Sequence, residues 1–147
     1  MNVTRRRVLV LCTGNSARSQ MAQGLIAHHL GAQWDAYSAG TRPSGYVHEL
    51  AILVMSEIGI DISLATSKSV EQYRGEPFDV VVTVCGDAAE SCPLWLGQGR
   101  VVHIGVVDPA LATGTREERI AAFRCVRDEL AERVLGFLRS MDGEPQC

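Results

Sequence analysis

The chain has 147 residues, of which 46% are hydrophobic and 21% charged, and its formal net charge is −3 at pH 7. This composition supports one core and an ordinary solvated surface, so we expect a single domain over residues 1–147. The net negative charge gives no general basis for binding nucleic acid or an anionic membrane. The apolar run 8–11 is too short for a membrane span or signal-peptide core, and we expect a cytoplasmic location.

Strand and helix signals alternate along the chain, without repeats or low-complexity tracts. Apolar runs predict strands at 7–11, 34–38, 78–84 and 100–104, and helical spacing predicts helices at 19–30, 47–58, 70–73 and 117–139. This alternation implies a parallel sheet with right-handed crossovers and helices on both faces. In such sheets, ligands bind beyond the carboxyl ends of the strands.

The most informative stretch connects the first predicted strand to the first predicted helix. It consists of small or polar residues between a cysteine and an arginine, followed by a serine: Cys12, Thr13, Gly14, Asn15, Ser16, Ala17, Arg18 and Ser19. Such a loop can curl so that its backbone N–H groups point inward at a helix N-terminus, which is a site for an oxyanion. We therefore predict that residues 13–19 bind a tetrahedral oxyanion.

Three side chains of this loop have predicted roles of their own. Arg18 offers a planar fork for two anion oxygens. Asn15 tolerates the left-handed turn that such a loop requires. Cys12 would lie beneath the anion, where the positive field and a hydrogen bond from Ser19 favour the thiolate. The pattern predicts a nucleophilic cysteine under an oxyanion.

Two further groups follow predicted strands and are expected at the same edge of the sheet. Cys85 follows the third strand, and Asp108 follows the fourth and precedes Pro109. Proline favours a loop over a helix there. When a thiolate displaces an oxygen from an oxyanion, the departing oxygen needs a proton, and Asp108 is a suitable donor.

The chain has five cysteines, an odd number without a Cys-x2-Cys pair, which argues against a disulfide framework or a zinc site. We expect no metal ion. A helical 85–92 segment would hold Cys85 and Cys92 about 10 Å apart along its axis. A disulfide needs α-carbons within about 7 Å, so bonding them demands that the segment unwind. Its Gly86 and Pro93 permit this.

Two thiols on such a segment, beside a nucleophilic thiol, indicate a redox relay. The alternative interpretation is that both are buried structural cysteines. The remaining cysteines and three of the histidines are expected to take no part in chemistry. We predict that Cys125 packs in the core, that Cys147 is an uninvolved tail thiol, and that surface or packing positions are taken by His28, His29 and His103.

Together these segments resemble the thioredoxin-coupled arsenate reductases, which share the low-molecular-weight protein tyrosine phosphatase fold. The matching stretches are 10–22, 37–40, 59–63, 85–93, 108–110 and 127–129. The resemblance implies an α/β fold of three layers, α/β/α, around a four-stranded parallel sheet. It also implies a monomer with no bound cofactor, arsenate as substrate and thioredoxin as external reductant.

The resemblance implies a relay of three thiols. Cys12 attacks arsenate held by the loop amides and Arg18, and Asp108 protonates the leaving oxygen. Cys85 then attacks the Cys12 sulfur and releases arsenite. Cys92 takes over the bond as a Cys85–Cys92 disulfide, which thioredoxin reduces.

Departures from the family pattern concern a potassium site and one cysteine. Relatives with that site carry acidic residues where this chain has Gln23 and Lys68. Both changes remove negative charge, and the Lys68 ammonium could take the cation's place, so we predict weak or absent potassium dependence. Ala17 replaces a cysteine of some relatives, which removes a route to wrong disulfides.

Two other functions are considered. A tyrosine phosphatase would use the same loop and acid, but such enzymes usually have a tyrosine just after the Asp-Pro pair, where Ala110 and Leu111 stand here. A non-catalytic arsenite or soft-metal binder would use the three thiols as ligands but leaves Arg18 and Asp108 unexplained.

Overall fold

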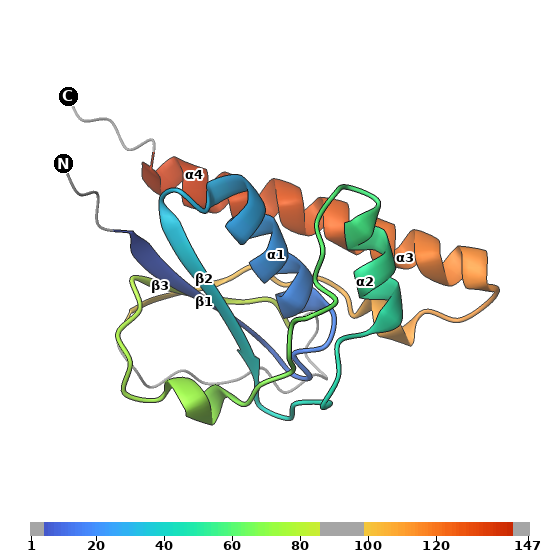
Figure 1. Ribbon diagram of the computed structural model, residues 1–147, viewed down its shortest axis with the longest axis horizontal. Helices are drawn as coiled ribbons and strands as arrows, with labels where there is room; N and C mark the ends of the chain where they lie inside the picture. Colours follow the sequence, from blue (N-terminus) through green and yellow to red (C-terminus); the bar gives the residue numbers. More distant parts are fainter. Residues whose placement is uncertain (1–4, 86–98, 143–147) are drawn as a thin grey trace.

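The computed structural model describes residues 5–85 and 99–142 (Figure 1). Its strands are β1 (Arg6–Cys12), β2 (Trp34–Gly40), β3 (Val80–Thr83) and β4 (Arg100–His103). Its helices are α1 (Arg18–Leu30), α2 (Glu49–Ser56), α3 (Arg116–Leu130) and α4 (Gly136–Asp142), with the 3-10 turns η1 (Val70–Tyr73) and η2 (Pro109–Leu111) and the π-turn η3 (Ala131–Leu135). The four strands are parallel, in the order β2-β1-β3-β4.

The central strand β1 is buried on both faces. Its alternate side chains Val8 and Val10 face the larger core, which contains side chains of α1, α2, α3 and α4. Leu9 and Leu11 face a smaller cluster, which includes Val70 of η1. The predicted fold class, a four-stranded parallel sheet in a three-layer α/β/α arrangement, is confirmed. In the described part of the chain, η1 is the helical element over the second face.

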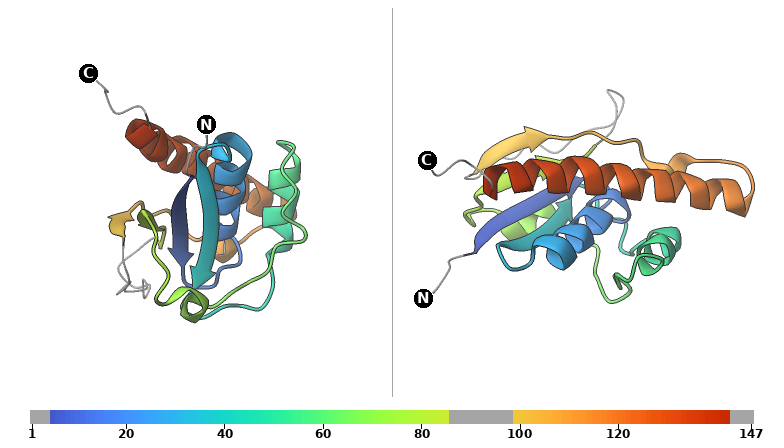
Figure 2. Two further views of the ribbon diagram at one scale, coloured as in Figure 1. Left: turned by 60° about the vertical axis from the view of Figure 1, so that its left-hand side comes forward. Right: turned by 90° about the horizontal axis from the view of Figure 1, so that it is seen from above.

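The last three helical elements form one continuous rod beside the sheet (Figure 2). The sequence predicted a helix over 117–139, and the structure extends it to 116–142. It begins in a capping box, in which the hydroxyl of Thr115 accepts from the N–H of Glu118 at 3.1 Å and the Glu118 carboxylate accepts from the N–H of Thr115 at 3.0 Å. The π-turn η3 was not predicted, because hydrophobic spacing carries no signal for it.

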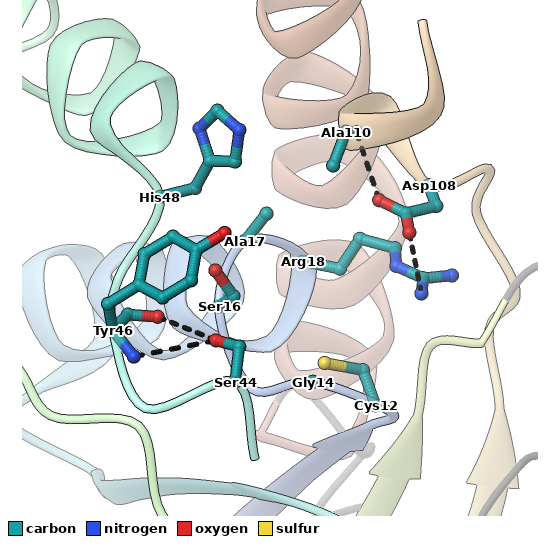
Figure 3. Close-up of a pocket in the computed structure, with 10 residues that line it drawn as sticks. All are labelled: Cys12, Gly14, Ser16, Ala17, Arg18, Ser44, Tyr46, His48, Asp108 and Ala110. Carbon is teal, nitrogen blue, oxygen red and sulfur yellow. Dashed lines mark hydrogen bonds and ion pairs between the residues drawn. The ribbon is translucent and has the colours of Figure 1, made fainter. Parts of the chain in front are cut away.

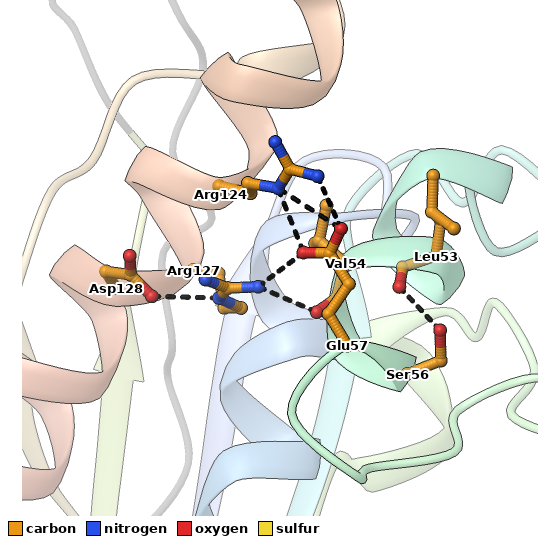
Figure 4. A network of polar contacts seen from close by, with 7 residues as sticks. All are labelled: Leu53, Val54, Ser56, Glu57, Arg124, Arg127 and Asp128. Carbon is orange, nitrogen blue, oxygen red and sulfur yellow. Dashed lines mark hydrogen bonds and ion pairs between the residues drawn. The ribbon is translucent and has the colours of Figure 1, made fainter. Parts of the chain in front are cut away.

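The C-terminal end of α2 is tied to α3 by a cluster of charged residues that we call the α2–α3 joint: Glu57, Arg124, Arg127 and Asp128 (Figure 4). Arg127 donates to the carbonyl oxygen of Val54 and to Oε1 of Glu57, both at 2.9 Å, and to Oδ1 of Asp128 at 2.8 Å. Nη2 of Arg124 lies 2.6 Å from Oε2 of Glu57. These hydrogen bonds, first from Arg124 and then from Arg127, lower the pKa of Glu57.

Helix α3 corrects one prediction. Cys125 is exposed, so the prediction that it packs in the core is wrong. The buried positions of α3 include Phe123 and Val126, and with about 100° between successive residues Cys125 falls outside that stripe. His28, His29 and His103 are exposed, as the surface interpretation predicted. Cys92 and Cys147 lie outside the described residues.

No helix within residues 5–85 and 99–142 has the length and apolar character that a bilayer span requires.

Candidate active site

A pocket of about 190 Å³ lies at the carboxyl end of β1 (Figure 3). The parallel register pairs Cys12 with Gly40 at the end of β2 and Leu11 with Thr83 at the end of β3. The pocket is lined by Cys12, Gly14, Ser16, Ala17, Arg18, Ser44, Tyr46, His48, Asp108 and Ala110. Residues from three separate stretches of sequence, 12–18, 44–48 and 108–110, thus meet where the sheet topology predicted a ligand site.

The Cys12 sulfur lies at the base of the pocket and is nearly buried. Its Sγ is 2.9 Å from the hydroxyl oxygen of Ser19, and the backbone N–H of Asn15 donates to it at 3.2 Å. Donors directed at sulfur interact more strongly with a thiolate than with a neutral thiol. The distance of 2.9 Å confirms the predicted contact between Ser19 and Cys12.

Asn15 holds the loop in its curled shape. Its φ of 47° lies in the left-handed region, as the sequence predicted. Its side-chain Nδ2 donates to the hydroxyls of Ser19 at 2.8 Å and Ser38 at 2.9 Å. Its Oδ1 accepts from the backbone N–H of Lys68 at 2.8 Å and from Nε2 of Gln20 at 3.0 Å. One buried amide thus fastens the loop to α1, to β2 and to the 66–69 segment.

The segment that follows β2 binds the outer side of the loop. Its backbone N–H groups at Arg42, Ser44 and His48 donate to the carbonyl oxygens of residues 13, 14 and 16 at 2.9, 2.9 and 3.0 Å. In a planar trans peptide the C=O and the following N–H point in opposite directions. The N–H groups of residues 14, 15 and 17 are therefore directed to the inner side, where an oxyanion would lie.

Gly40 makes this close packing possible. A Cβ added at this position would overlap the carbonyl oxygen of Thr13 and come within 3.0 Å of the backbone nitrogen of Asn15. The loop can therefore pass so close to the end of β2 only because residue 40 has no side chain.

The Ser16 hydroxyl makes no hydrogen bond within the described structure. Its Oγ is buried, has no hydrogen-bond partner there, and belongs to a residue that lines the pocket. Buried polar atoms in proteins are nearly always paired. An unpaired hydroxyl at this position is thus consistent with a site whose partner is a ligand.

Arg18 and Asp108 lie on the side of the pocket across from Tyr46 and His48 (Figure 3). Arg18 is 3% exposed, and its Nη1 donates to the carbonyl oxygen of Val106 at 3.2 Å. Its Nη2 lies 3.7 Å from Oδ2 of Asp108. The other oxygen of Asp108 accepts from the N–H of Ala110 at 3.0 Å and so caps η2. The sequence predicted a loop here, but the structure has the 3-10 turn η2. Pro109 fits the first position of that turn, where no backbone N–H is needed.

Cys85 lies at the end of the strand next to β1. The N–H of Val84 donates to the carbonyl oxygen of Leu11 at 2.9 Å, which places the two strand ends side by side. Cys85 is 2% exposed and shares the larger core with Cys12. The predicted partner Cys92 lies outside the described residues. The other two predicted relay thiols lie near the carboxyl ends of the neighbouring strands β1 and β3.

Lys68 contacts the loop through Asn15, and Gln23 contacts Ser38, to which Asn15 is also bonded. The amide of Gln23 accepts from the hydroxyl of Ser38 at 2.5 Å and donates to the carbonyl oxygen of Ala36 at 3.1 Å. Nζ of Lys68 donates to the carbonyl oxygen of Thr66 at 2.7 Å, and burial lowers the pKa of this ammonium. Among residues 5–85 and 99–142, no three His, Cys, Asp or Glu side chains cluster as a metal site would require.

Several pocket residues were not predicted from the sequence. Ser44, Tyr46 and His48 come from the connection between β2 and α2, where the sequence predicted only a helix beginning at residue 47. The available signal was the position of His48 directly before an apolar helical run, where capping residues occur. Nothing in the sequence marked Tyr46, whose side chain is 59% exposed.

The class of protein is defined by the fold and by this pocket, in which the loop between β1 and α1 begins with a cysteine. Residues 7–146 match the model of the family described as low molecular weight phosphotyrosine protein phosphatase. The chain therefore belongs to this family.

Within this family, several relatives of the chain are named arsenate reductase. It is 47% identical over 135 residues to an arsenate reductase of Halalkalibacterium halodurans, an overlap that covers 92% of this chain and 96% of the relative. The crystal structure of an arsenate reductase from Archaeoglobus fulgidus superposes with a TM-score of 0.76 at 28% identity, over 90% of this chain and 98% of that one. A thioredoxin-dependent arsenate reductase of Corynebacterium glutamicum superposes with a TM-score of 0.69 at 25% identity, over 99% of this chain and 66% of that one. The resemblance found in the sequence is thereby confirmed.

Proposed function

We propose that this chain is an enzyme that reduces arsenate to arsenite, with Cys12 as nucleophile. The observation that carries the proposal is the meeting of Cys12, Arg18 and Asp108 in one pocket, with Cys85 at the end of the adjacent strand. The relatives named arsenate reductase support the choice of substrate.

The first step is a displacement at arsenic. The loop N–H groups and the Arg18 guanidinium bind the arsenate oxygens, so that the Cys12 thiolate faces the arsenic atom. A sulfur–arsenic bond forms and an arsenic–oxygen bond breaks. Asp108 donates a proton to the departing oxygen, which leaves as water.

The second step transfers the electrons. The Cys85 thiolate attacks the Cys12 sulfur, a sulfur–sulfur bond forms, and the sulfur–arsenic bond breaks with its electron pair remaining on arsenic. Arsenic(V) thus becomes arsenic(III) and leaves as arsenite, while two thiolates become a Cys12–Cys85 disulfide. The side-by-side ends of β1 and β3 support this assignment, because the attack needs the two thiols within reach.

The remaining steps restore Cys12. Cys92 attacks Cys85, which frees Cys12 and moves the disulfide to Cys85–Cys92. The dithiol of thioredoxin then takes over this disulfide by exchange and is itself oxidised. The thioredoxin-dependent arsenate reductase among the similar structures supports thioredoxin as reductant. We propose a cytoplasmic, monomeric, single-domain protein without a bound cofactor.

The contacts of Gln23 and Lys68 support weak or absent potassium dependence. The Lys68 ammonium already donates to a carbonyl oxygen beside the loop, and the neutral Gln23 amide is bonded at both ends. Equal arsenate reduction rates in potassium and sodium salts are the expected result. A rate that rises with potassium but not with sodium would contradict it.

A second candidate is a tyrosine phosphatase, which the family membership itself favours. Phosphate and arsenate share shape and charge, so weak hydrolysis of aryl phosphates is expected in either case. The phosphatase reaction uses Cys12, Arg18 and Asp108 but does not need Cys85 or Cys92.

One experiment separates these functions from each other and from a soft-metal binder. Arsenate, thioredoxin, thioredoxin reductase and NADPH are combined with the parent protein or with Cys12→Ser, Cys85→Ser or Cys92→Ser, and NADPH loss is followed. The exposed Cys125 provides the matched control Cys125→Ser.

The relay requires sustained turnover in the parent and in Cys125→Ser, and none in the other three variants. A phosphatase would hydrolyse p-nitrophenyl phosphate in Cys85→Ser and Cys92→Ser and show no arsenate-dependent NADPH loss. A pure binder would do neither.

A further inference from the structure

His48 is a pocket residue to which the proposed reaction assigns no role. Its backbone N–H binds the carbonyl oxygen of Ser16, its ring lies 4.7 Å from the buried ring of Phe123, and it lines the same pocket as Cys12. The ring stands at the rim of the pocket, across from Asp108 and Ala110 (Figure 3).

The hydrogen bonds of the ring decide where its proton lies. Nδ1 of His48 accepts from the backbone N–H of Leu50 at 3.0 Å and so caps α2. A nitrogen that accepts has no proton, so the neutral ring carries its proton on Nε2. Among the described residues, Nε2–H has no hydrogen-bond partner. The hydrogen bond from Leu50 to Nδ1 holds the ring in place, and Nε2–H can donate to a ligand at the rim of the pocket.

The ring is held in this neutral form. Burial, together with the positive charge of Arg119 on α3, lowers the pKa of His48, and the carboxylates of Glu49 and Asp108 only partly oppose this. Protonation would also place a hydrogen on Nδ1 and break the cap on α2. At neutral pH the ring is therefore a donor through Nε2 and not a cation.

The geometry of an in-line displacement determines what this donor can meet. Three oxygens of a tetrahedral anion lie in the loop, and the fourth points away from the Cys12 sulfur, toward the rim. In inorganic arsenate or phosphate this outer oxygen is a free hydroxyl or O⁻, which is a strong acceptor. In a phosphate monoester it is bonded to carbon and is a poorer acceptor.

We propose that His48 is a specificity-determining residue whose Nε2–H binds the outer oxygen of an inorganic oxyanion and so favours inorganic arsenate and phosphate over phosphate esters. The proposal rests on the oxyanion pocket of the proposed function but does not require the thiol relay. Aryl esters lose this hydrogen bond, because their outer oxygen is bonded to carbon.

The test uses inorganic phosphate and p-nitrophenyl phosphate as probes of the pocket. His48→Asn keeps a good cap for α2, since asparagine is among the best N-cap residues, but removes the Nε2 donor. His48→Ala removes both cap and donor. His28→Asn, at an exposed position on α1, is the matched control. For each protein, the inhibition constant of phosphate, kcat/KM for p-nitrophenyl phosphate and the thermal melting temperature are measured.

In His48→Asn we expect roughly tenfold weaker phosphate inhibition, from the loss of one hydrogen bond to a charged oxygen. The kcat/KM for the ester should stay within about threefold of the parent, and the melting temperature should be unchanged. His48→Ala should show the same loss of phosphate inhibition and a lower melting temperature.

Two results would overturn the proposal. Unchanged phosphate inhibition in His48→Asn would show that the donor does not reach the anion. Equal losses for phosphate and ester would show that His48 only shapes the pocket. Both results can be read even if the protein fails to reduce arsenate, so the two proposals fail separately.

Discussion

The oxyanion loop, residues 12–19, and the α2–α3 joint are both polar clusters around a nearly buried arginine, but they differ in how fully their groups are paired. In the joint, Arg127 makes three hydrogen bonds of 2.8–2.9 Å. In the loop, Ser16 Oγ has no partner among the described residues. Saturated polar groups hold elements together, whereas spare polar capacity in a pocket prepares it for a ligand.

The largest expected effect comes from replacing the planar guanidinium group of Arg18. Arg18→Lys keeps the charge but loses the planar pair of donors that matches two anion oxygens. We expect kcat/KM for arsenate to fall about a hundredfold, from the loss of charged hydrogen bonds. Urea unfolding should show little change in stability. Activity near that of the parent would mean that Arg18 does not bind the substrate.

The corresponding change in the joint should have the opposite outcome. Arg127→Met removes three hydrogen bonds at a nearly buried position, and we expect the free energy of unfolding to fall by about 2 kcal/mol. The kcat/KM per folded molecule should stay within about twofold. The exposed ion pair of Arg74 with Glu71 offers a control, since Arg74→Met should cost less than about 1 kcal/mol.

Gly40→Ala tests whether the loop must lie against β2. The added methyl group would overlap the Thr13 carbonyl oxygen, so the loop must shift. We expect about 1–3 kcal/mol of destabilisation and weaker inhibition by inorganic phosphate, by about tenfold. Gly136, around which a Cβ would meet nothing, supplies the control Gly136→Ala. Unchanged phosphate inhibition in Gly40→Ala would contradict this account of the loop.

The smallest expected effect is the acid sensitivity of the joint. Arg124 and Arg127 lower the pKa of Glu57 in the folded protein, so the unfolded chain takes up this proton first as the pH falls. The stabilising contribution is full above about pH 4.5 and is lost as the pH falls through the lower folded value. Glu57→Gln should therefore show a shallower decline of stability in acid, measured by urea unfolding at several pH values. An identical decline in both proteins would show that Glu57 is not linked to acid unfolding.

Most of the fold was predictable because its signals are local. The apolar run at 7–11 predicted a strand, and the structure has β1 there, covered by two core clusters. Residues 19–30 predicted a helix whose start the structure moves by only one residue. Cys125 was assigned wrongly because membership of a buried stripe depends on which side of the helix the sheet covers.

The sequence alone determined the curled loop after β1, because small residues, Asn15 and the flanking Cys12 and Arg18 act over a few bonds. Only the tertiary structure decided what surrounds that loop: Gly40 beneath it, the 42–48 segment on its outer carbonyls, and His48 at its rim. These groups meet through the parallel pairing of strands and the packing of α2 on α3. Such contacts join residues distant in the chain and leave no periodic signal in it.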